Sequence, residues 1–385
     1  MAGRRRVIGA IGVTQTLAWA ASYYLPAIVA VPMARDFGLP PSAVFAAFSA
    51  ALLLTAVLGP AVGRVIDRRG GRGVLALSNL AFATGLVILA AAPTGWPSVL
   101  FLGWGVLGLG MALGLYDPAF ATLTGLYGRD ARGAITGVTL MAGFASTIGW
   151  PLTTLMTEAL GWRGACLGWA ASQIVIALPL HLLAVPPAPP PAPAAASPGA
   201  GEVPASWGAM ALLALAMAGT GFNTSAMAAH LPGLLSQAGA SPDGALLAAS
   251  LVGPMQVAAR LVEFGLLGQV HPLVTGRLAA AAHPLAAALL GLGAGPVVFA
   301  VIHGSANGLL TIVRGTLPLA LFGPRGYGAR QGMILAPMRL IQAVAPLAFG
   351  LALERAGLGA LWVFAAVGAI SLAALLVLRP RAETP

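Results

Sequence analysis

The chain alternates long apolar segments with short polar ones along its whole length. A window of about 19 residues, the length suited to membrane hydropathy, gives twelve apolar segments, and the ninth is the weakest because Gly, Pro and His283 interrupt it. The segments lie near residues 7–33, 42–66, 73–93, 98–126, 133–160, 165–185, 207–236, 244–269, 277–292, 296–321, 331–354 and 360–378. A helix needs about 20 apolar residues to cross a bilayer core. The pattern therefore predicts an all-α membrane protein with twelve transmembrane helices.

Composition supports this prediction. Hydrophobic residues make up 58% of the 385 residues and charged residues only 8%, and the mean hydropathy is +0.90. A soluble domain carries roughly 25% charged residues. A surface so poor in charge has to face lipid or other helices, so the two or three soluble domains that the length alone would suggest are excluded.

The basic residues are distributed unevenly about the predicted membrane. All 20 are Arg, and with the N-terminus inside, fourteen fall on the cytoplasmic side and three on the outer side. The fourteen are Arg4, Arg5, Arg6, Arg64, Arg68, Arg69, Arg72, Arg129, Arg132, Arg277, Arg325, Arg330, Arg379 and Arg381, and the three are Arg35, Arg163 and Arg355. This is the positive-inside distribution. It predicts a multi-pass protein of the bacterial inner membrane with both termini in the cytoplasm, and it disfavours the nucleic-acid binding that a basic chain would otherwise suggest.

The first apolar segment follows Arg4, Arg5 and Arg6 and invites comparison with a signal peptide. It is too long for one, contains Gln15 and Trp19, and is followed by many further segments. We therefore expect an uncleaved first helix. The single Cys166 excludes an internal disulfide framework and gives no signal about compartment.

Residues 186–206 read PPAPPPAPAAASPGAGEVPAS, with eight prolines in 21 positions. Such a segment forms neither helix nor sheet and is expected to be an extended, solvated cytoplasmic linker. It divides the chain into an N-terminal six-helix bundle, residues 1–185, and a C-terminal one, residues 207–385.

The two bundles look like repeats. LAWA at 17–20 matches LAMA at 215–218, and Tyr24 matches Phe222. In the next region, Gly63, Gly71 and Arg72 match, in that order, Gly268, Gly276 and Arg277. In the last region, Gly128, Gly133, Gly137 and Pro151 match, in that order, Gly323, Gly328, Gly332 and Pro346. All are offset by 195 to 205 residues. Parallel repeats of this kind are a transporter architecture in which substrate binds between the repeats near the membrane midplane.

Residues 63–72, between the second and third segments, read GRVIDRRGGR. They resemble the signature loop of the major facilitator superfamily, G-x-x-x-D-R-x-G-R-R, and depart from it only at Gly71. The resemblance extends over the whole chain. It implies the twelve-helix major facilitator fold, transport by alternating access, and a cytoplasmic conformational latch formed by Gly63, Asp67, Arg68, Gly70 and Arg72. The alternative is an ordinary positively charged loop.

Three Arg residues, Arg260, Arg314 and Arg339, fall inside predicted helices. Arg260 shares a helix face with Gln256 and Glu263, and an Arg within the bilayer usually faces a wet cavity or a partner. The sequence around Arg260, GPMQVAARLVEFG, is similar to the oxalate–formate antiporter and monocarboxylate porter branch, as are YGRDARGAITG and GFASTIGWP. The similarity implies that Arg260 and Arg339 bind substrate carboxylates, with Gln256 beside them. The alternatives are neutralisation of Arg260 by Glu263, helix carbonyls as partners of Arg339, and snorkelling of Arg314.

Further candidate residues lie in the N-terminal half. Trp19, Tyr23 and Tyr24, with Gln15 one turn earlier, either line a substrate cavity or form an interfacial aromatic belt. Asp117, in Tyr116-Asp117-Pro118, is either a proton carrier or a charge partner for an Arg of the signature loop. Glu263 is the corresponding candidate for proton coupling in the C-terminal half.

The leading hypothesis is a secondary active transporter, a symporter or antiporter, for a small organic anion, coupled to a proton or a counter-anion. We expect a monomer with no cofactor, no resident metal and no enzymatic activity, because the chain has no phosphate-binding Gly-Lys-Ser/Thr loop and no nucleophile–His–acid set. The alternatives are proton-coupled efflux of drugs or amphipathic metabolites, copper transport through Met227, His230 and Met255, and a sensor that transports nothing. Trp104, four residues before Gly108, stands where drug antiporters usually carry Arg and counts against efflux.

Overall fold

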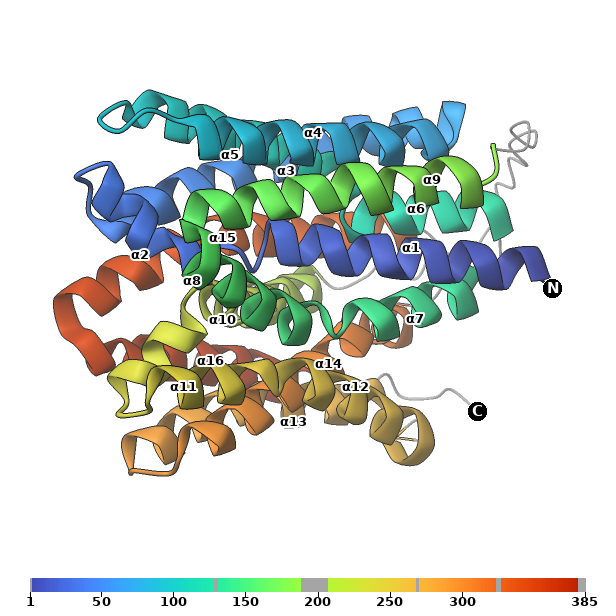
Figure 1. Cartoon of the computed structure of the whole chain (residues 1–385). Helices are drawn as coiled ribbons and strands as arrows, with labels where there is room; N and C mark the ends of the chain where they lie inside the picture. The colour runs from blue at the N-terminus through green and yellow to red at the C-terminus, as the bar shows by residue number, and fades with distance from the viewer. Residues whose placement is uncertain (1, 128–130, 188–206, 268–269, 323–326, 380–385) are drawn as a thin grey trace. The chain divides into compact units, whose positions relative to one another are not determined.

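The computed structural model describes residues 2–127, 131–187, 207–267, 270–322 and 327–379. It divides into two compact units, Met1–Pro193 and Ala194–Pro385, here called unit 1 and unit 2. The described residues of both units are helical and contain no strand (Figure 1). The all-α prediction is therefore confirmed. The Pro-rich segment predicted as a linker lies almost entirely outside the described residues.

The described residues of unit 1 form ten helical elements. They are α1 (Ala2–Ala21), α2 (Pro26–Asp36), α3 (Pro41–Arg69), α4 (Gly71–Ala91), α5 (Pro97–Gly114), α6 (Tyr116–Tyr127), α7 (Ala131–Ala142), α8 (Ala145–Ser172), the π-helical η2 (Gln173–Ala177) and α9 (Leu178–Ala184). Helix α4 packs against α5 and α8, α3 against α5, and α1 against α7 and α8.

In unit 2, the residues that the structure describes form nine helical elements. They are α10 (Trp207–Gln237), α11 (Pro242–Ser250), α12 (Val252–Val262), the π-helical η3 (Glu263–Leu267), α13 (Pro272–Gly291), α14 (Pro296–Phe322), α15 (Tyr327–Ala356), the 3-10 turn η4 (Gly357–Gly359) and α16 (Ala360–Val377). Helix α10 packs against α15 and α16, and α14 packs against α12 and α13. Many helices of both units begin with Pro, which lacks the N–H that a first helical residue cannot use.

The described residues form 10 continuous segments that are long and apolar enough to cross a membrane. Two of them, 133–184 and 333–377, are 52 and 45 residues long, at least twice what one crossing needs. The first bends at Gly161, with φ 73°, and the second at Gly357, with φ 53°. Division at these two glycines gives twelve membrane segments. Their bounds agree with the predicted ones to within a few residues at most ends.

Glycines with positive φ occupy matching turns in the two units. Each such φ lies in the left-handed region that other residues rarely adopt. Gly38 (φ 64°), Gly95 (φ 85°) and Gly161 (φ 73°) follow the first, third and fifth segments of unit 1, and Gly239 (φ 95°), Gly293 (φ 90°) and Gly357 (φ 53°) follow the same segments of unit 2. The backbone thus repeats its turns even where the side chains have diverged.

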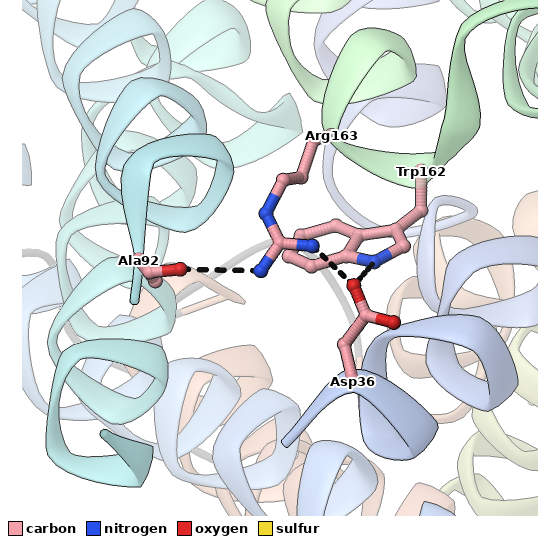
Figure 2. Close-up of polar contacts among 4 residues, drawn as sticks. All are labelled: Asp36, Ala92, Trp162 and Arg163. Carbon is pink, nitrogen blue, oxygen red and sulfur yellow. Dashed lines mark hydrogen bonds and ion pairs between the residues drawn. The ribbon is translucent and has the colours of Figure 1, made fainter. Parts of the chain in front are cut away.

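Three segments of unit 1 are joined by polar contacts at the end that the Arg distribution assigns to the outer side (Figure 2). Arg163 forms an ion pair with Asp36 at the end of α2 and donates to the carbonyl of Ala92 after α4, at 3.2 Å. Trp162 Nε1 donates to Asp36 Oδ2 at 2.9 Å, and the Arg163 guanidinium lies 4.2 Å from the centre of the Trp162 ring system. The bend at Gly161 brings both side chains to this position.

Candidate functional site

The first and fourth membrane segments of unit 1 are interrupted near their middles. The first breaks at residues 22–25, between α1 and α2, and the fourth at Leu115, which has an extended backbone (φ −78°, ψ −163°). Trp19 precedes the first break and Tyr116 follows the second, with ring centroids 4.8 Å apart. Interrupted helices with backbone freed at membrane depth are a common feature of transporter binding sites.

Gln15 stabilises the break in the fourth segment. Pro118 has no N–H, so the carbonyl of Gly114, four residues earlier, has no helical donor. The Nε2 of Gln15, a fully buried side chain, donates to that carbonyl. Gln15 thus completes the hydrogen bonding of the interrupted fourth segment.

An aromatic group surrounds the two breaks. It consists of Trp19, Tyr23, Tyr24, Phe48, Trp104, Tyr116, Phe120 and Trp150. Tyr23 is buried and contacts Phe48, with ring centroids 5.8 Å apart, and Tyr24 contacts Trp150 at 5.4 Å. Tyr23 therefore packs inside unit 1, and Tyr24 is partly buried.

Asp117 is exposed and lies in the first turn of α6, directly after the Leu115 break. A carboxylate at that position is favoured by the positive end of the helix dipole. The position agrees with either predicted role and does not separate the proton carrier from the charge partner.

Arg260 is the most deeply buried of the predicted substrate residues with a charge. It lies on α12 with 8% of its surface exposed. Its Nη2 donates to Thr311 Oγ1 at 3.2 Å, on α14, and to Gln256 Oε1 at 3.4 Å. The predicted proximity of Gln256 to Arg260 is thus present in the structure, whereas Thr311 was not identified from the sequence.

Two glycines explain why α12 and α14 approach so closely. A Cβ at Gly304 would lie 2.9 Å from the Cα of Val252, and one at Gly308 would lie 2.9 Å from the Cα of Gln256. This is the small-residue spacing at which membrane helices pack backbone to backbone. The close approach brings Arg260 within hydrogen-bond reach of α14.

Helix α14 carries a polar stripe, defined by His303, Asn307 and Thr311. The three residues are spaced four apart and share one helix face. Thr311 donates to the Asn307 carbonyl at 2.9 Å, and the Asn307 side chain contacts His303 Nε2 at 3.0 Å. Thr224 of α10 donates to Asn307 Oδ1 at 2.9 Å. The stripe connects Arg260 with the buried interior of unit 2, and the sequence analysis missed it.

The other predicted charged residues of unit 2 lie on α15 and η3. Arg339 is partly buried on α15, which packs against α10. Glu263 begins the π-helical η3 directly after α12 and is partly exposed.

The signature segment is helical and not a loop. Helix α3 continues to Arg69, and only Gly70, with φ 78°, separates it from α4. The side chain of Asp67 lies outside the described part of the structure, and the Arg68 side chain is exposed. Gly71 lies against Thr122 of α6, whose Cβ would be 2.5 Å from a Cβ at position 71. The departure from the signature at Gly71 therefore has a steric reason.

One of the residues considered for copper, His230, contacts the backbone of another helix. His230 Nε2 lies 2.8 Å from the carbonyl of Pro346 and donates to it, and Met227 is buried. Among the described residues, no group of three or more His, Cys, Asp or Glu side chains is arranged to hold a metal ion.

Twelve apolar membrane segments in two helical units, with interrupted helices and a buried Arg at membrane depth, define a multi-pass membrane transporter. The sequence matches the family model of the Major Facilitator Superfamily over residues 11–300. The chain belongs to this superfamily. Its members are secondary transporters, and the chain is one of that class.

Similar proteins support the fold and leave the substrate open. An uncharacterised 38 kDa protein of the 23S RNA operon of Thermoproteus tenax is 29% identical over 368 residues, which are 93% of this chain and 91% of the relative. The nucleoside transporter NupG, solved as a point variant, has a TM-score of 0.77 at 15% identity, covering 97% of this chain and 99% of its own. A bacterial homologue of the human lysosomal transporter Spinster, inward-facing and occupied, has a TM-score of 0.67 at 18% identity, covering 98% and 94%.

Proposed function

We propose that this secondary transporter moves a small organic anion, a mono- or dicarboxylate, and that Arg260 binds its anionic group. The observation that carries the proposal is the environment of Arg260. Guanidinium stays charged at any accessible pH, and a charge inside the bilayer is costly and is generally retained for function. Thr311 and Gln256 contact the guanidinium through neutral oxygens, which holds the group between α12 and α14.

Arg339 supplies a second positive charge on the same unit and is proposed to assist Arg260. It lies on a membrane helix that contains two internal prolines, Pro337 and Pro346. Its planar guanidinium suits bidentate binding of a carboxylate. A dicarboxylate would use both cations, and a monocarboxylate only one.

The test is binding and flux with oxalate, lactate and succinate, using purified protein and proteoliposomes. Arg260→Gln and Arg339→Gln should each raise the Kd for the carboxylate at least about tenfold, which corresponds to about 1.4 kcal/mol of binding free energy. The Kd is obtained from the thermal stabilisation that the carboxylate induces. Arg260→Lys should keep weak binding because it keeps the charge and loses the planar fork. Thr311→Val should weaken binding, whereas Thr316→Val, whose hydroxyl bonds only its own helix at Ile312, is the matched control.

Normal carboxylate binding by Arg260→Gln would contradict the assignment of Arg260. A wild-type protein that responds to none of the three anions would contradict the organic-anion proposal itself.

A second candidate is transport of a solute with a planar ring, including efflux of amphipathic compounds. The aromatic group of unit 1 favours it, because rings at 4.8 to 5.8 Å from one another can stack on a flat ligand. NupG, one of the similar structures, is a nucleoside transporter. Uridine and ethidium in the same assays distinguish this candidate: Trp19→Ala and Tyr24→Ala should then abolish stabilisation, while Arg260→Gln leaves it intact.

A further inference from the structure

Two histidines of unit 2, His283 on α13 and His303 on α14, form a buried pair. Their ring centroids are 5.5 Å apart, and 0% and 1% of their surfaces are exposed. Phe299 and Phe364 enclose them, with centroid distances of 5.4 to 5.8 Å to the two rings. His283 is not part of the candidate site described above, and His303 belongs to it only as a member of the polar stripe.

The ring nitrogens of this pair are only partly used. The amide nitrogen of Asn307 donates to His303 Nε2 at 3.0 Å, so neutral His303 carries its hydrogen on Nδ1. Within the described part of the chain, His303 Nδ1 and both ring nitrogens of His283 have no hydrogen-bond partner. Buried polar atoms are normally paired, and three unpaired imidazole nitrogens in one contact pair need an explanation other than packing.

The surroundings of the pair contain few charges. Arg314, on α14, acts electrostatically on His283. On α13, Arg277 donates to the carbonyls of Leu375, Leu376 and Leu378. Helix α16 carries no charged residue, and the titratable residue of α10 is His230, which bonds the Pro346 carbonyl.

The polar stripe links the pair to Arg260. From His303 the path runs through the Asn307 side chain and its carbonyl to Thr311, and from there to the Arg260 guanidinium. Each step is a hydrogen bond or one helical turn. His303 and Arg260 thus lie at the two ends of one line of polar groups along α14.

We propose that the His283–His303 pair is the proton-binding site of the transport cycle. One proton adds to the ring nitrogen of His283 that carries no hydrogen, and it leaves from the same atom on the opposite side of the membrane. A positive charge buried among Phe299, Phe364 and Arg314 is costly, so proton binding favours a conformation that admits water to the pair. This couples protons to alternating access, and it goes beyond the organic-anion proposal without depending on it.

The first test needs no substrate. Full-length protein labelled with ¹⁵N at its five His residues is placed in nanodiscs, and imidazole resonances are followed by NMR from pH 5 to 8.5. We expect a pair of coupled titrating rings that is lost in His283→Leu and in His303→Gln, whereas the resonances of His181 stay those of a neutral ring. Asn307→Asp places a carboxylate beside His303 and should keep the pair protonated to a higher pH. The proposal would be overturned if the rings of His283 and His303 stay neutral over the whole pH range, both in wild-type protein and in Asn307→Asp.

The second test separates coupling from binding, using lactate in proteoliposomes with an imposed pH gradient. His283→Leu, outside the polar stripe, should lose accumulation driven by the gradient, at least about tenfold, while lactate exchange without a gradient continues. Loss of exchange together with accumulation, in the folded variant, would mean a structural role and would overturn the proposal. If wild-type protein ignores lactate, oxalate or succinate takes its place. If it ignores all three anions, the organic-anion proposal fails and the NMR result decides the proton site alone.

Discussion

The buried histidines of the two units have opposite environments. In unit 1, His181 receives a hydrogen bond from Asn79 at Nδ1 and contacts Thr14 Oγ1 at Nε2, both at 2.8 Å, so each ring nitrogen has a partner. In unit 2, neither ring nitrogen of His283 has one among the described residues. Two equally buried imidazoles can therefore serve different purposes. The first joins three helical segments, and the second retains the capacity to bind a proton.

The membrane segments of the two units also differ, both in where they are interrupted and in the side chains that they carry there. Unit 1 interrupts its first and fourth segments and fills the breaks with aromatic rings. In unit 2 the eighth segment changes helix at Leu251, whose backbone stays helical (φ −70°, ψ −17°), and polar side chains line α14. The repeated turns preserve the backbone path, while the residues at membrane depth have specialised: rings in one unit, hydrogen-bonding groups and a cation in the other.

The largest expected difference in stability between matching positions of the two units is at Gly71 and Gly276, when each is replaced by Ala. A Cβ at Gly71 would collide with Thr122, which is held by its own hydrogen bond to Pro118. At Gly276 the nearest atom, a methyl carbon of Val313, would be 3.3 Å away. Gly71→Ala should therefore cost about 3 kcal/mol by overpacking, and Gly276→Ala should be neutral or stabilising by up to about 1 kcal/mol.

Thermal melting of the purified protein measures both. Thr122→Ala introduced together with Gly71→Ala should recover much of the loss. Equal melting temperatures for the two single variants would mean that the repeats are packed alike at this position.

A smaller contrast is expected between His181 and His283. His181→Leu leaves the buried Asn79 amide and Thr14 hydroxyl without their ring partner, which should cost about 2 kcal/mol. His283→Leu removes nitrogens that have no hydrogen-bond partner among the described residues, so it should leave the melting temperature unchanged or higher. Melting curves in the same detergent test this, and a His283→Leu variant as unstable as His181→Leu would remove the distinction between the two environments.

The smallest effect is expected at the outer-end contacts of unit 1. Arg163 and Asp36 are partly exposed, with 32% and 37% of their side chains accessible, so the pair is worth about 1 kcal/mol at most. Arg163→Gln should lower the melting temperature by a few degrees at low salt and by less at high salt. Arg355 is exposed before the matching Gly357 turn of unit 2, so Arg355→Gln should leave the melting temperature unchanged at either salt concentration. If the loss of stability in Arg163→Gln does not depend on salt, its cause is the lost stacking of Arg163 on Trp162.

Much of the fold could be predicted because hydropathy reports directly on membrane segments. The segment bounds, the all-α class and the superfamily followed from apolar windows and from residues 63–72. The break at Leu115 could not be found in this way, because Leu, Tyr and Pro fit an apolar window whether or not the helix is continuous. Pro118 was the available signal, and the donor that completes the break, Gln15, lies 99 residues away.

The polar stripe escaped prediction for a related reason. His303, Asn307 and Thr311 are mildly polar residues in an otherwise apolar helix, and their spacing gains meaning only when Arg260 is known to lie beside them. The sequence marked Arg260 because a charge in a membrane segment is rare. It marked His283 only as an interruption of the ninth segment, since hydropathy does not record which ring nitrogens have partners.

Gly70 is the only residue between α3 and α4, and this has a mechanical consequence. A connection of several residues would act as a slack tether and absorb displacement. A connection of one residue acts as a pivot: when the end of α3 shifts, the start of α4 is carried with it, and the two helices can change only the angle between them. Gly71, wedged against Thr122, holds one side of that pivot fixed. We therefore expect α3 and α4 to move together at this end and to differ in tilt at the other.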